Sequence, residues 1–196
     1  MNYEILNMEQ RSPEWFEIRS QCITGTTAKY LLREGKKEAL KIVKQKLIDH
    51  INNPSTGWAA KRGQDLEPKA RELLNKKLHM NDLTKAINID EVGFVKRTDI
   101  ENVGCSPDGC YINDKGEIEY ITEIKCFLEK HHLECSGTPD QNIRIQIQWN
   151  LWVTGAKWCY FVQYNPDLDD STKILFITKI KPDPDYFEAF ERKMAE

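Results

Sequence analysis

A turn followed by an alternating run constrains this chain more than any other feature. Residues 106–109 read Ser-Pro-Asp-Gly, a turn sequence follows at 113–116, and apolar and charged side chains then alternate up to Lys125. Successive side chains of a strand point to opposite faces, so Glu123 and Lys125 share one face while the other face is apolar. The turn folds the chain back and brings Asp108 beside Glu123 at one edge of a sheet.

These groups match the ligand preference of a hard divalent cation. Mg²⁺ takes oxygen ligands, often one or two protein carboxylates, and Asp108, Glu123 and the backbone carbonyl of Ile124 are the candidates. Hydrolysis of a phosphodiester needs roughly 20 kcal/mol of rate enhancement, which bound metal ions help to supply. Lys125 would then orient or deprotonate the attacking water and stabilise developing charge. The alternative is an exposed strand with alternating charge, because these residue types are common on strands.

Length and composition favour one globular domain spanning residues 1–196. The chain is 40% hydrophobic and 30% charged, without an apolar run long enough to cross a bilayer. The N-terminus lacks the pattern of a secretory signal, and six cysteines without a C-x-x-C pair indicate reduced thiols in the cytoplasm. The net charge is −3, so a surface for nucleic acid must be local.

Periodicity and cap signals predict interspersed helices and strands. Helices are expected near 13–22, 27–33, 37–51, 68–78, 139–154 and 184–195, and strands near 92–98, 157–165 and 173–181, in addition to the central hairpin. This order predicts an α/β (α+β) fold with a mixed central sheet flanked by helices. Pro68 is expected to place Glu67 at a helix N-terminus. His131 and His132 are expected in a loop near the substrate.

A second candidate site combines Arg19 with Thr24 and Thr26. The hydroxyls lie at the start of a predicted helix, where, together with the arginine, they can bind a phosphate. The alternative is an ordinary helix cap and a surface arginine. Basic residues around Glu67 are candidates for contacts with a nucleic-acid backbone, and Trp58 and Tyr30 are candidates either for base stacking or for the core. These basic residues are Lys61, Arg62, Lys69, Arg71, Lys76 and Lys77, of which the last two are better explained as a solvated helix face.

Several motifs follow one another in the order of a known family. They are Trp15 to Arg19, Ile23 to Thr26, Gly63 to Glu67, Ser106 to Gly109, Glu123 to Lys125, Gln146 to Gln148 and Trp152 to Thr154. With them, the chain from about Trp15 to Asn165 resembles the lambda-exonuclease-like (YqaJ-type) viral recombinases of the PD-(D/E)xK nuclease superfamily. The resemblance implies a restriction-endonuclease-like core.

The resemblance also implies a role for each candidate residue. Asp108, Glu123 and the Ile124 carbonyl would bind metal with Glu67 as a third acid, Lys125 would be the catalytic lysine, and Gln146 would contact the water or the scissile phosphate. Arg19, Thr24 and Thr26 would bind a 5′-terminal phosphate. Two positions depart from the family pattern, because Thr26 stands where serine is common and Gly25 where alanine is common.

The activity that the resemblance implies is 5′→3′ exonucleolytic digestion of linear double-stranded DNA. It would use Mg²⁺, with Mn²⁺ as a substitute and two ions bound, in viral or prophage recombination within the host cytoplasm. The implied partners are double-stranded DNA ends, a single-strand annealing protein and further copies of the chain in a trimer, without a membrane. Two alternatives remain, namely an endonuclease or nickase of other polarity on the same fold, and a non-catalytic DNA-binding protein.

Overall fold

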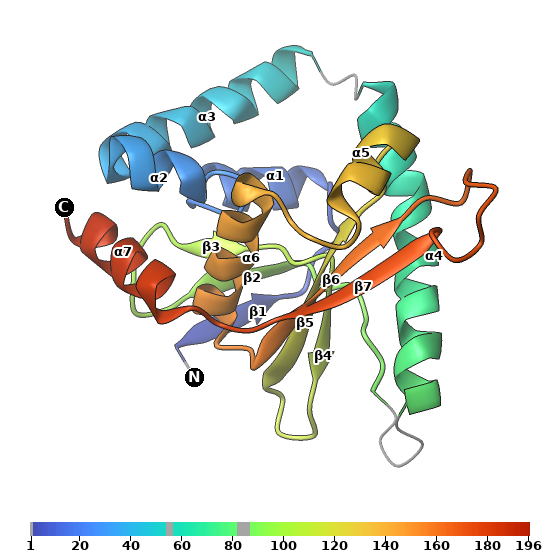
Figure 1. The fold of residues 1–196 in the computed structure, drawn as a ribbon. Helices are drawn as coiled ribbons and strands as arrows, with labels where there is room; N and C mark the ends of the chain where they lie inside the picture. Colours follow the sequence, from blue (N-terminus) through green and yellow to red (C-terminus); the bar gives the residue numbers. More distant parts are fainter. Residues whose placement is uncertain (1, 54–56, 82–86) are drawn as a thin grey trace.

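Helices and strands are interspersed along the chain in the computed structural model, which describes residues 2–53, 57–81 and 87–196 (Figure 1). The elements are β1 (Tyr3–Leu6), α1 (Pro13–Ser20), α2 (Ala28–Glu34), α3 (Lys36–Asn52), α4 (Trp58–Asn81), β2 (Phe94–Arg97), β3 (Gly104–Cys105), β4 (Gly109–Ile112), β5 (Ile118–Lys125), α5 (Glu129–Cys135), α6 (Gln141–Thr154), β6 (Trp158–Tyr164), β7 (Leu175–Ile180) and α7 (Pro184–Ala195).

A mixed sheet lies at the centre, in the order β4-β5-β6-β7. β5 runs parallel to β6 and antiparallel to β4, and β7 runs antiparallel to β6. A parallel pair needs a crossover connection, and here α5 and α6 lie between the two strands in sequence. Helices α4 and α6 both pack against β5 and β6 (Figure 1). The predicted α/β class with a mixed, helix-flanked sheet is therefore confirmed.

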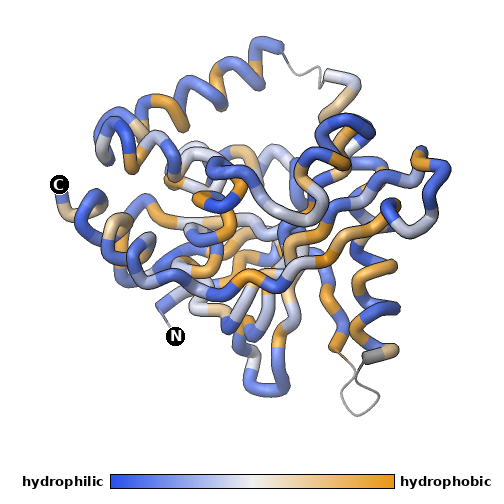
Figure 2. The backbone as a smooth tube through the Cα atoms, viewed as in Figure 1, coloured by the Kyte–Doolittle hydropathy of each residue, from blue (hydrophilic) through white to orange (hydrophobic). Residues whose placement is uncertain are grey.

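The two faces of β5 contribute to two different core clusters. Tyr120 and Ile124 pack in a cluster with Leu74 of α4, whereas Ile121 belongs to the cluster that contains Ile147 of α6. Both faces are thus covered, which explains why β5 is buried along almost its entire length. Figure 2 shows the corresponding concentration of apolar residues along the central strands.

A second, antiparallel sheet in the order β1-β2-β3 packs against α6. The strand expected at 92–98 is β2. Sequence patterning did not predict β1 or β3, because strands of four and two residues are too short to show a period of two.

The expected start of the helix at Pro68 was wrong. Helix α4 begins at Trp58, so Pro68 lies in its interior and Glu67 lies in mid-helix. An interior proline removes one helical hydrogen bond, but tertiary contacts hold the earlier turns. The Arg62 side chain donates to the carbonyl of Cys126 at 2.7 Å and to the Asn165 side chain at 2.9 Å. These bonds tie the first half of α4 to the sheet.

The expectation of a loop at His131 and His132 was also wrong, because both residues lie in α5. His132 is fully buried, and its Nε2 lies 2.7 Å from the carbonyl oxygen of Lys173. It packs against Phe176 of β7, so its role is to anchor α5 rather than to face a substrate. All six cysteines are free thiols.

No helix within the described residues has both the length and the apolar content that a membrane span requires.

Replacing Pro68 by alanine tests its interior position. We expect P68A to raise the free energy of unfolding by about 1–2 kcal/mol, because the regained helical bond outweighs the lost restriction of the unfolded chain. The matched control is P184A at the first turn of α7, which should lower stability by about 0.4–1 kcal/mol. Urea unfolding measures both, and equal destabilisation by the two changes would contradict the interior placement.

Candidate functional site

The hairpin between β4 and β5 brings Asp108 to Glu123, as the sequence predicted. Gly109 pairs with Thr122, and the Asp108 backbone N–H donates to the Thr122 carbonyl at 3.1 Å. The Ile124 backbone N–H donates to the Asp108 carboxylate at 2.6 Å. Asp108 is therefore fixed beside the C-terminal end of β5, next to Glu123 and Lys125.

Glu123 is held by a cation and two amides. Its side chain is 1% exposed, and one oxygen accepts hydrogen bonds from Lys125 Nζ and Gln146 Nε2, each at 2.6 Å. The other oxygen accepts from Asn150 Nδ2 at 3.4 Å. Asn150 was not predicted as a site residue, although its spacing of four from Gln146 puts both on one face of α6.

Glu67 reaches the same region from α4 with two arginines. Its carboxylate contacts Arg11 at 3.1 Å and Arg71 at 2.9 Å, and Arg71 Nε also donates to the Asp108 carbonyl at 2.8 Å. Sequence reasoning missed Arg11, which lies in an irregular segment before α1 and adopts a positive φ of 69°. No local pattern links residue 11 to residue 67.

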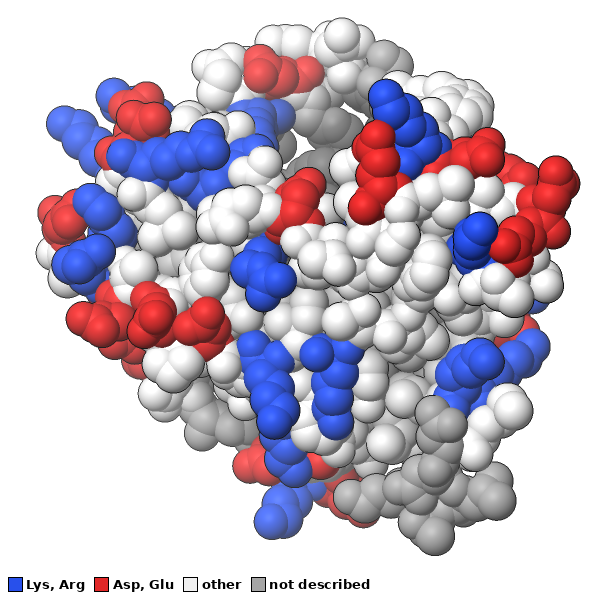
Figure 3. All heavy atoms as spheres, viewed as in Figure 1, with Lys and Arg blue, Asp and Glu red and all other residues white. Residues whose placement is uncertain are grey.

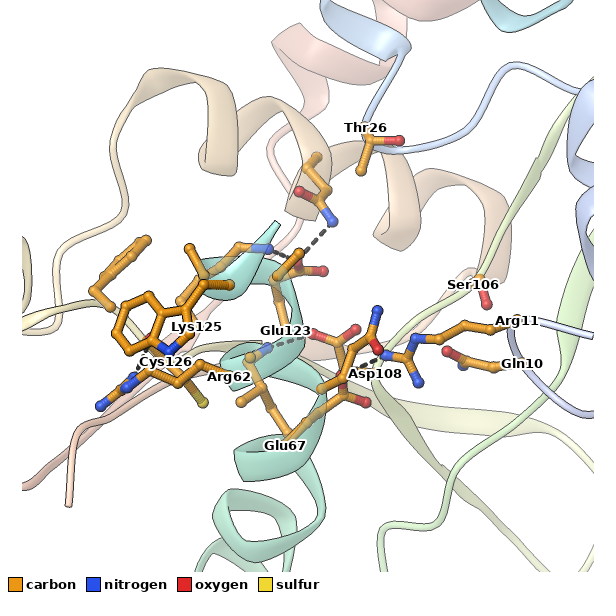
Figure 4. Close-up of a pocket in the computed structure, with 18 of the residues that line it drawn as sticks. Gln10, Arg11, Thr26, Arg62, Glu67, Ser106, Asp108, Glu123, Lys125 and Cys126 are labelled. Carbon is orange, nitrogen blue, oxygen red and sulfur yellow. Dashed lines mark hydrogen bonds and ion pairs between the residues drawn. The ribbon is translucent and has the colours of Figure 1, made fainter. Parts of the chain in front are cut away.

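A cleft of about 430 Å³ joins these groups. The candidate residues that line it are Arg19, Thr26, Glu67, Asp108, Glu123, Ile124, Lys125 and Gln146. Figure 4 shows the acidic side chains turned toward one space from α4, the β3–β4 connection and β5. The structure therefore brings together every predicted site residue except Thr24, which lines an adjacent pocket of about 180 Å³ with Arg19 and Thr26.

Burial raises the pKa of all three acids. Burial, and then repulsion from Asp108, raises the pKa of both Glu67 and Glu123 to about 7. Burial likewise raises the pKa of Asp108. Burial opposes the charge of Lys125, yet the Glu123 and Asp108 carboxylates raise the pKa of its ammonium group above the usual value. Burial therefore disfavours the charged form of these acids despite the cations beside them.

This donor set fits a magnesium ion. Within the described residues no three His, Cys, Asp or Glu side chains are grouped closely enough to hold a metal by themselves. Asp108 and Glu123 nevertheless line the same cleft and repel each other electrostatically. Mg²⁺ normally keeps several waters and needs only one or two carboxylates, so two acids and a backbone carbonyl are a suitable set. Glu67, paired with its arginines, lies beside them.

Arg19 marks the opposite, positive side of the cleft. Its guanidinium lies 4.2 Å from the Trp15 ring centroid and donates to Thr26 Oγ1 at 3.3 Å. Burial lowers the pKa of Arg19 to about 10, which leaves the group charged at neutral pH. Thr24 is buried, and its hydroxyl lies 3.3 Å from that of Thr26. The exposed Thr26 hydroxyl thus presents the hydrogen-bonding group of this loop.

Several basic residues of α4 have structural partners. Arg62 and Arg71 are largely buried, and both form ion pairs with acidic side chains. Lys61, Lys69 and Lys76 form ion pairs with acids of the same helix. Figure 3 shows that Lys and Arg side chains gather instead over α2 and α3 on the face viewed. Trp58 is 68% exposed at the cleft, whereas Tyr30 packs against the core.

Comparison with known proteins gives the family. The YqaJ-like viral recombinase domain matches residues 14–157, a range that contains every residue of the acidic cluster. The chain belongs to this family.

Solved structures with the same fold are exonucleases. This YqaJ-like chain is similar to the alkaline exonuclease LHK-Exo from Laribacter hongkongensis, with 26% identity over 94% of this chain and 89% of that one, at a TM-score of 0.71. The complex of LHK-Exo with dAMP matches at 25% identity and the same TM-score and coverage. A phage-related exonuclease from Haemophilus somnus 129PT shares the fold at 10% identity, a TM-score of 0.54 and coverage of 92% and 93%. No curated protein matches the chain.

The raised pKa values predict how stability depends on pH without a divalent cation. Glu67 and Glu123 have folded pKa values of about 7 against an ordinary value of 4.5. The folded state binds more protons between these values, so stability should fall as pH rises from about 5 to 7 and level off above. Replacing Glu123 by glutamine should reduce the fall by at least about 1.4 kcal/mol, the value of one pKa unit. Urea unfolding in chelator measures this, with E38Q on the exposed face of α3 as the control. A flat wild-type profile would contradict the raised pKa values of Glu67 and Glu123.

Proposed function

We propose that this protein is a Mg²⁺-dependent DNA exonuclease that degrades linear double-stranded DNA in the 5′→3′ direction. The observation that carries the proposal is a single cleft with buried acids on one side and Arg19 with Thr26 on the other. Family membership and the similarity to alkaline exonucleases support a nuclease. The buried acids support the choice of Mg²⁺, and a phosphate site at Arg19 and Thr26 supports the 5′ polarity that the family resemblance implies.

Asp108 and Glu123, with the Ile124 carbonyl, are the residues that would hold the cation. A bound cation lowers the pKa of a coordinated water and stabilises charge on a leaving oxygen. The chain itself fixes the ligands, since Asp108 is tied to the Ile124 N–H and Glu123 to Gln146 and Asn150. Glu67 with Arg11 and Arg71 borders the same space. Whether one or two ions bind stays a prediction.

Lys125 has the electrostatic properties of a charge stabiliser. Its raised pKa keeps the ammonium group protonated at neutral pH. Lys125 is therefore better suited to stabilise the negative charge of a phosphate than to accept a proton. Its hydrogen bond to Glu123 also orients it toward the cleft. Gln146 donates to the same carboxylate oxygen, so both side chains lie where a scissile phosphate would meet the acids.

The other side of the cleft suits a terminal phosphate. Within the described residues no carboxylate forms an ion pair with Arg19, and the Thr26 hydroxyl adds a neutral donor beside it. A phosphate bound there would place the adjoining phosphodiester toward the acids, which favours release of nucleotides from the 5′ end. Oligomer formation, an annealing partner, a cytoplasmic location and a single domain over 1–196 remain parts of the proposal.

Replacing Asp108 by alanine tests the acidic cluster. We expect Mg²⁺-dependent digestion of linear duplex DNA to fall at least about a thousandfold, equivalent to about 4 kcal/mol in the barrier, because one of the two main carboxylates is lost. Circular dichroism checks that the fold is kept, and D65A on the exposed side of α4 serves as the control. Retained cleavage in D108A would refute the site. Digestion of closed circular duplex by the wild type would favour an endonuclease instead.

Arg19 should determine the preference for a phosphorylated end. Wild-type protein should digest duplex DNA with a 5′-phosphate faster than DNA with a 5′-hydroxyl, by roughly tenfold or more for a charge-assisted contact. R19A should remove this difference, whereas R33A on α2 should preserve it. The measurement is the initial rate on end-labelled duplexes with the two end chemistries. Equal wild-type rates would exclude this role of Arg19.

A further inference from the structure

Asn150 contacts both sides of the cleft. It is 2% exposed on α6, and its Nδ2 donates to Glu123. On its other side it abuts Gly25, because a Cβ added there would lie 2.6 Å from Asn150 Oδ1. Gly25 belongs to the loop that carries Thr24 and Thr26. Asn150 therefore lies between that loop and the acidic cluster.

The orientation of this amide follows from its neighbours. Nδ2 faces Glu123, because an oxygen in that position would oppose a carboxylate oxygen. Oδ1 then faces Gly25, where it is buried without a hydrogen-bond partner among the described residues. A buried oxygen without a hydrogen-bond partner lowers the stability of the fold. Because no hydrogen bond holds this oxygen beside Gly25, the packing around Asn150 must hold it there.

Gly25 packs against Gln146 and Asn150, whose side-chain amides donate to Glu123. The same added Cβ would lie 2.8 Å from Gln146 Cγ and 3.1 Å from the Gln146 carbonyl oxygen. A glycine at this position allows the loop backbone to approach α6 closely. The loop backbone therefore packs directly against the two residues that supply the neutral donors of the Glu123 carboxylate.

Hydrogen bonds within the loop tie its residues to one another. The Thr24 N–H donates to Thr27 Oγ1 at 2.8 Å, and the Thr27 and Ala28 N–H groups both donate to the Thr24 carbonyl at 2.8 Å. Arg19 binds the Thr26 hydroxyl from outside this turn. A ligand that fixes Arg19 and Thr26 thus fixes the position of Gly25.

We propose that Asn150 is a positioning residue that couples the DNA-end site to the acidic cluster. A 5′-phosphate on Arg19 and Thr26 fixes the loop, and the loop in turn holds the Gln146 and Asn150 amides against Glu123. Binding of the end and binding of the cation then strengthen each other by the same factor, as linkage requires. This inference rests on the proposed function.

The test measures binding without turnover. The probes are Mn²⁺, followed by the electron paramagnetic resonance signal of the free ion, and dAMP, which carries a 5′-phosphate but no scissile bond. In the wild type, saturating dAMP should tighten Mn²⁺ binding about fivefold or more, whereas deoxyadenosine should have no effect. The coupling factor is the Mn²⁺ dissociation constant without dAMP divided by that with saturating dAMP. N150A should still bind both probes, but its coupling factor should be close to one. The control is Q148A, a buried amide of α6 that bonds to the Lys181 carbonyl and the Asp183 N–H instead, and it should keep the wild-type factor.

A second variant tests the contact from the other side. G25A places a methyl group against Asn150 and Gln146. Both the Mn²⁺ affinity and the coupling factor should therefore fall, although the loop contributes no carboxylate to the cation site. In a G25A/N150A double variant the loss caused by the methyl group should be smaller, because its closest neighbour is gone. Additive effects would overturn the proposal. If N150A does not fold, the coupling factor of G25A decides, and an unchanged factor overturns it.

The remaining outcomes separate the two proposals. If wild-type protein binds Mn²⁺ and dAMP independently, the coupling is refuted while the nuclease proposal stands. A coupling factor retained in N150A likewise refutes the role of Asn150 alone. If the wild type binds neither probe, the proposed function fails and the coupling fails with it.

Discussion

The register between β4 and β5 is the constraint on which the site depends. Gly109 lies opposite Thr122, and this pairing puts Asp108 next to the strand segment that carries Glu123. A slip of one residue would turn Glu123 toward the α4 core and Ile124 toward the cleft. Close packing fixes the register, since a Cβ on Gly109 would lie 2.7 Å from Ile89 Cγ2 and 3.0 Å from Thr122 Cγ2. The strand pairing thus determines the chemistry as well as the fold.

Burial of Glu123 then determines what surrounds it. A buried carboxylate is costly unless donors compensate it, and Lys125, Gln146 and Asn150 supply three. Its pKa nevertheless rises to about 7, because burial and the neighbouring Asp108 outweigh these donors. The local side chains are therefore sufficient to keep the group in place without fully stabilising its charge. A cation bound beside Glu123 would favour the charged carboxylate and lower its pKa.

Local signals made part of this arrangement predictable. The turn at 113–116 and the alternation after it predicted the hairpin and the approach of Asp108 to Glu123. The N-terminal half of α4 and the position of His132 were mispredicted, because Arg62 and the Lys173 carbonyl stabilise them from distant parts of the chain. Contacts between residues so far apart leave no trace in local periodicity, and the same holds for the pairing of Arg11 with Glu67.

The distribution of charge in the cleft supports the proposal that one cavity binds a cation and a phosphate together. Arg11 and Arg71 are committed to Glu67, and Lys125 is committed to Glu123, so the cations on the acidic side are neutralised in place. Arg19 is different, since its described contacts are the Trp15 ring and the neutral Thr26 hydroxyl. An anion from solution is therefore expected to bind most favourably at Arg19, and a cation from solution at Asp108 and Glu123. The close approach of Gly25 to Gln146 and Asn150 connects the two sides of the cleft through packed residues.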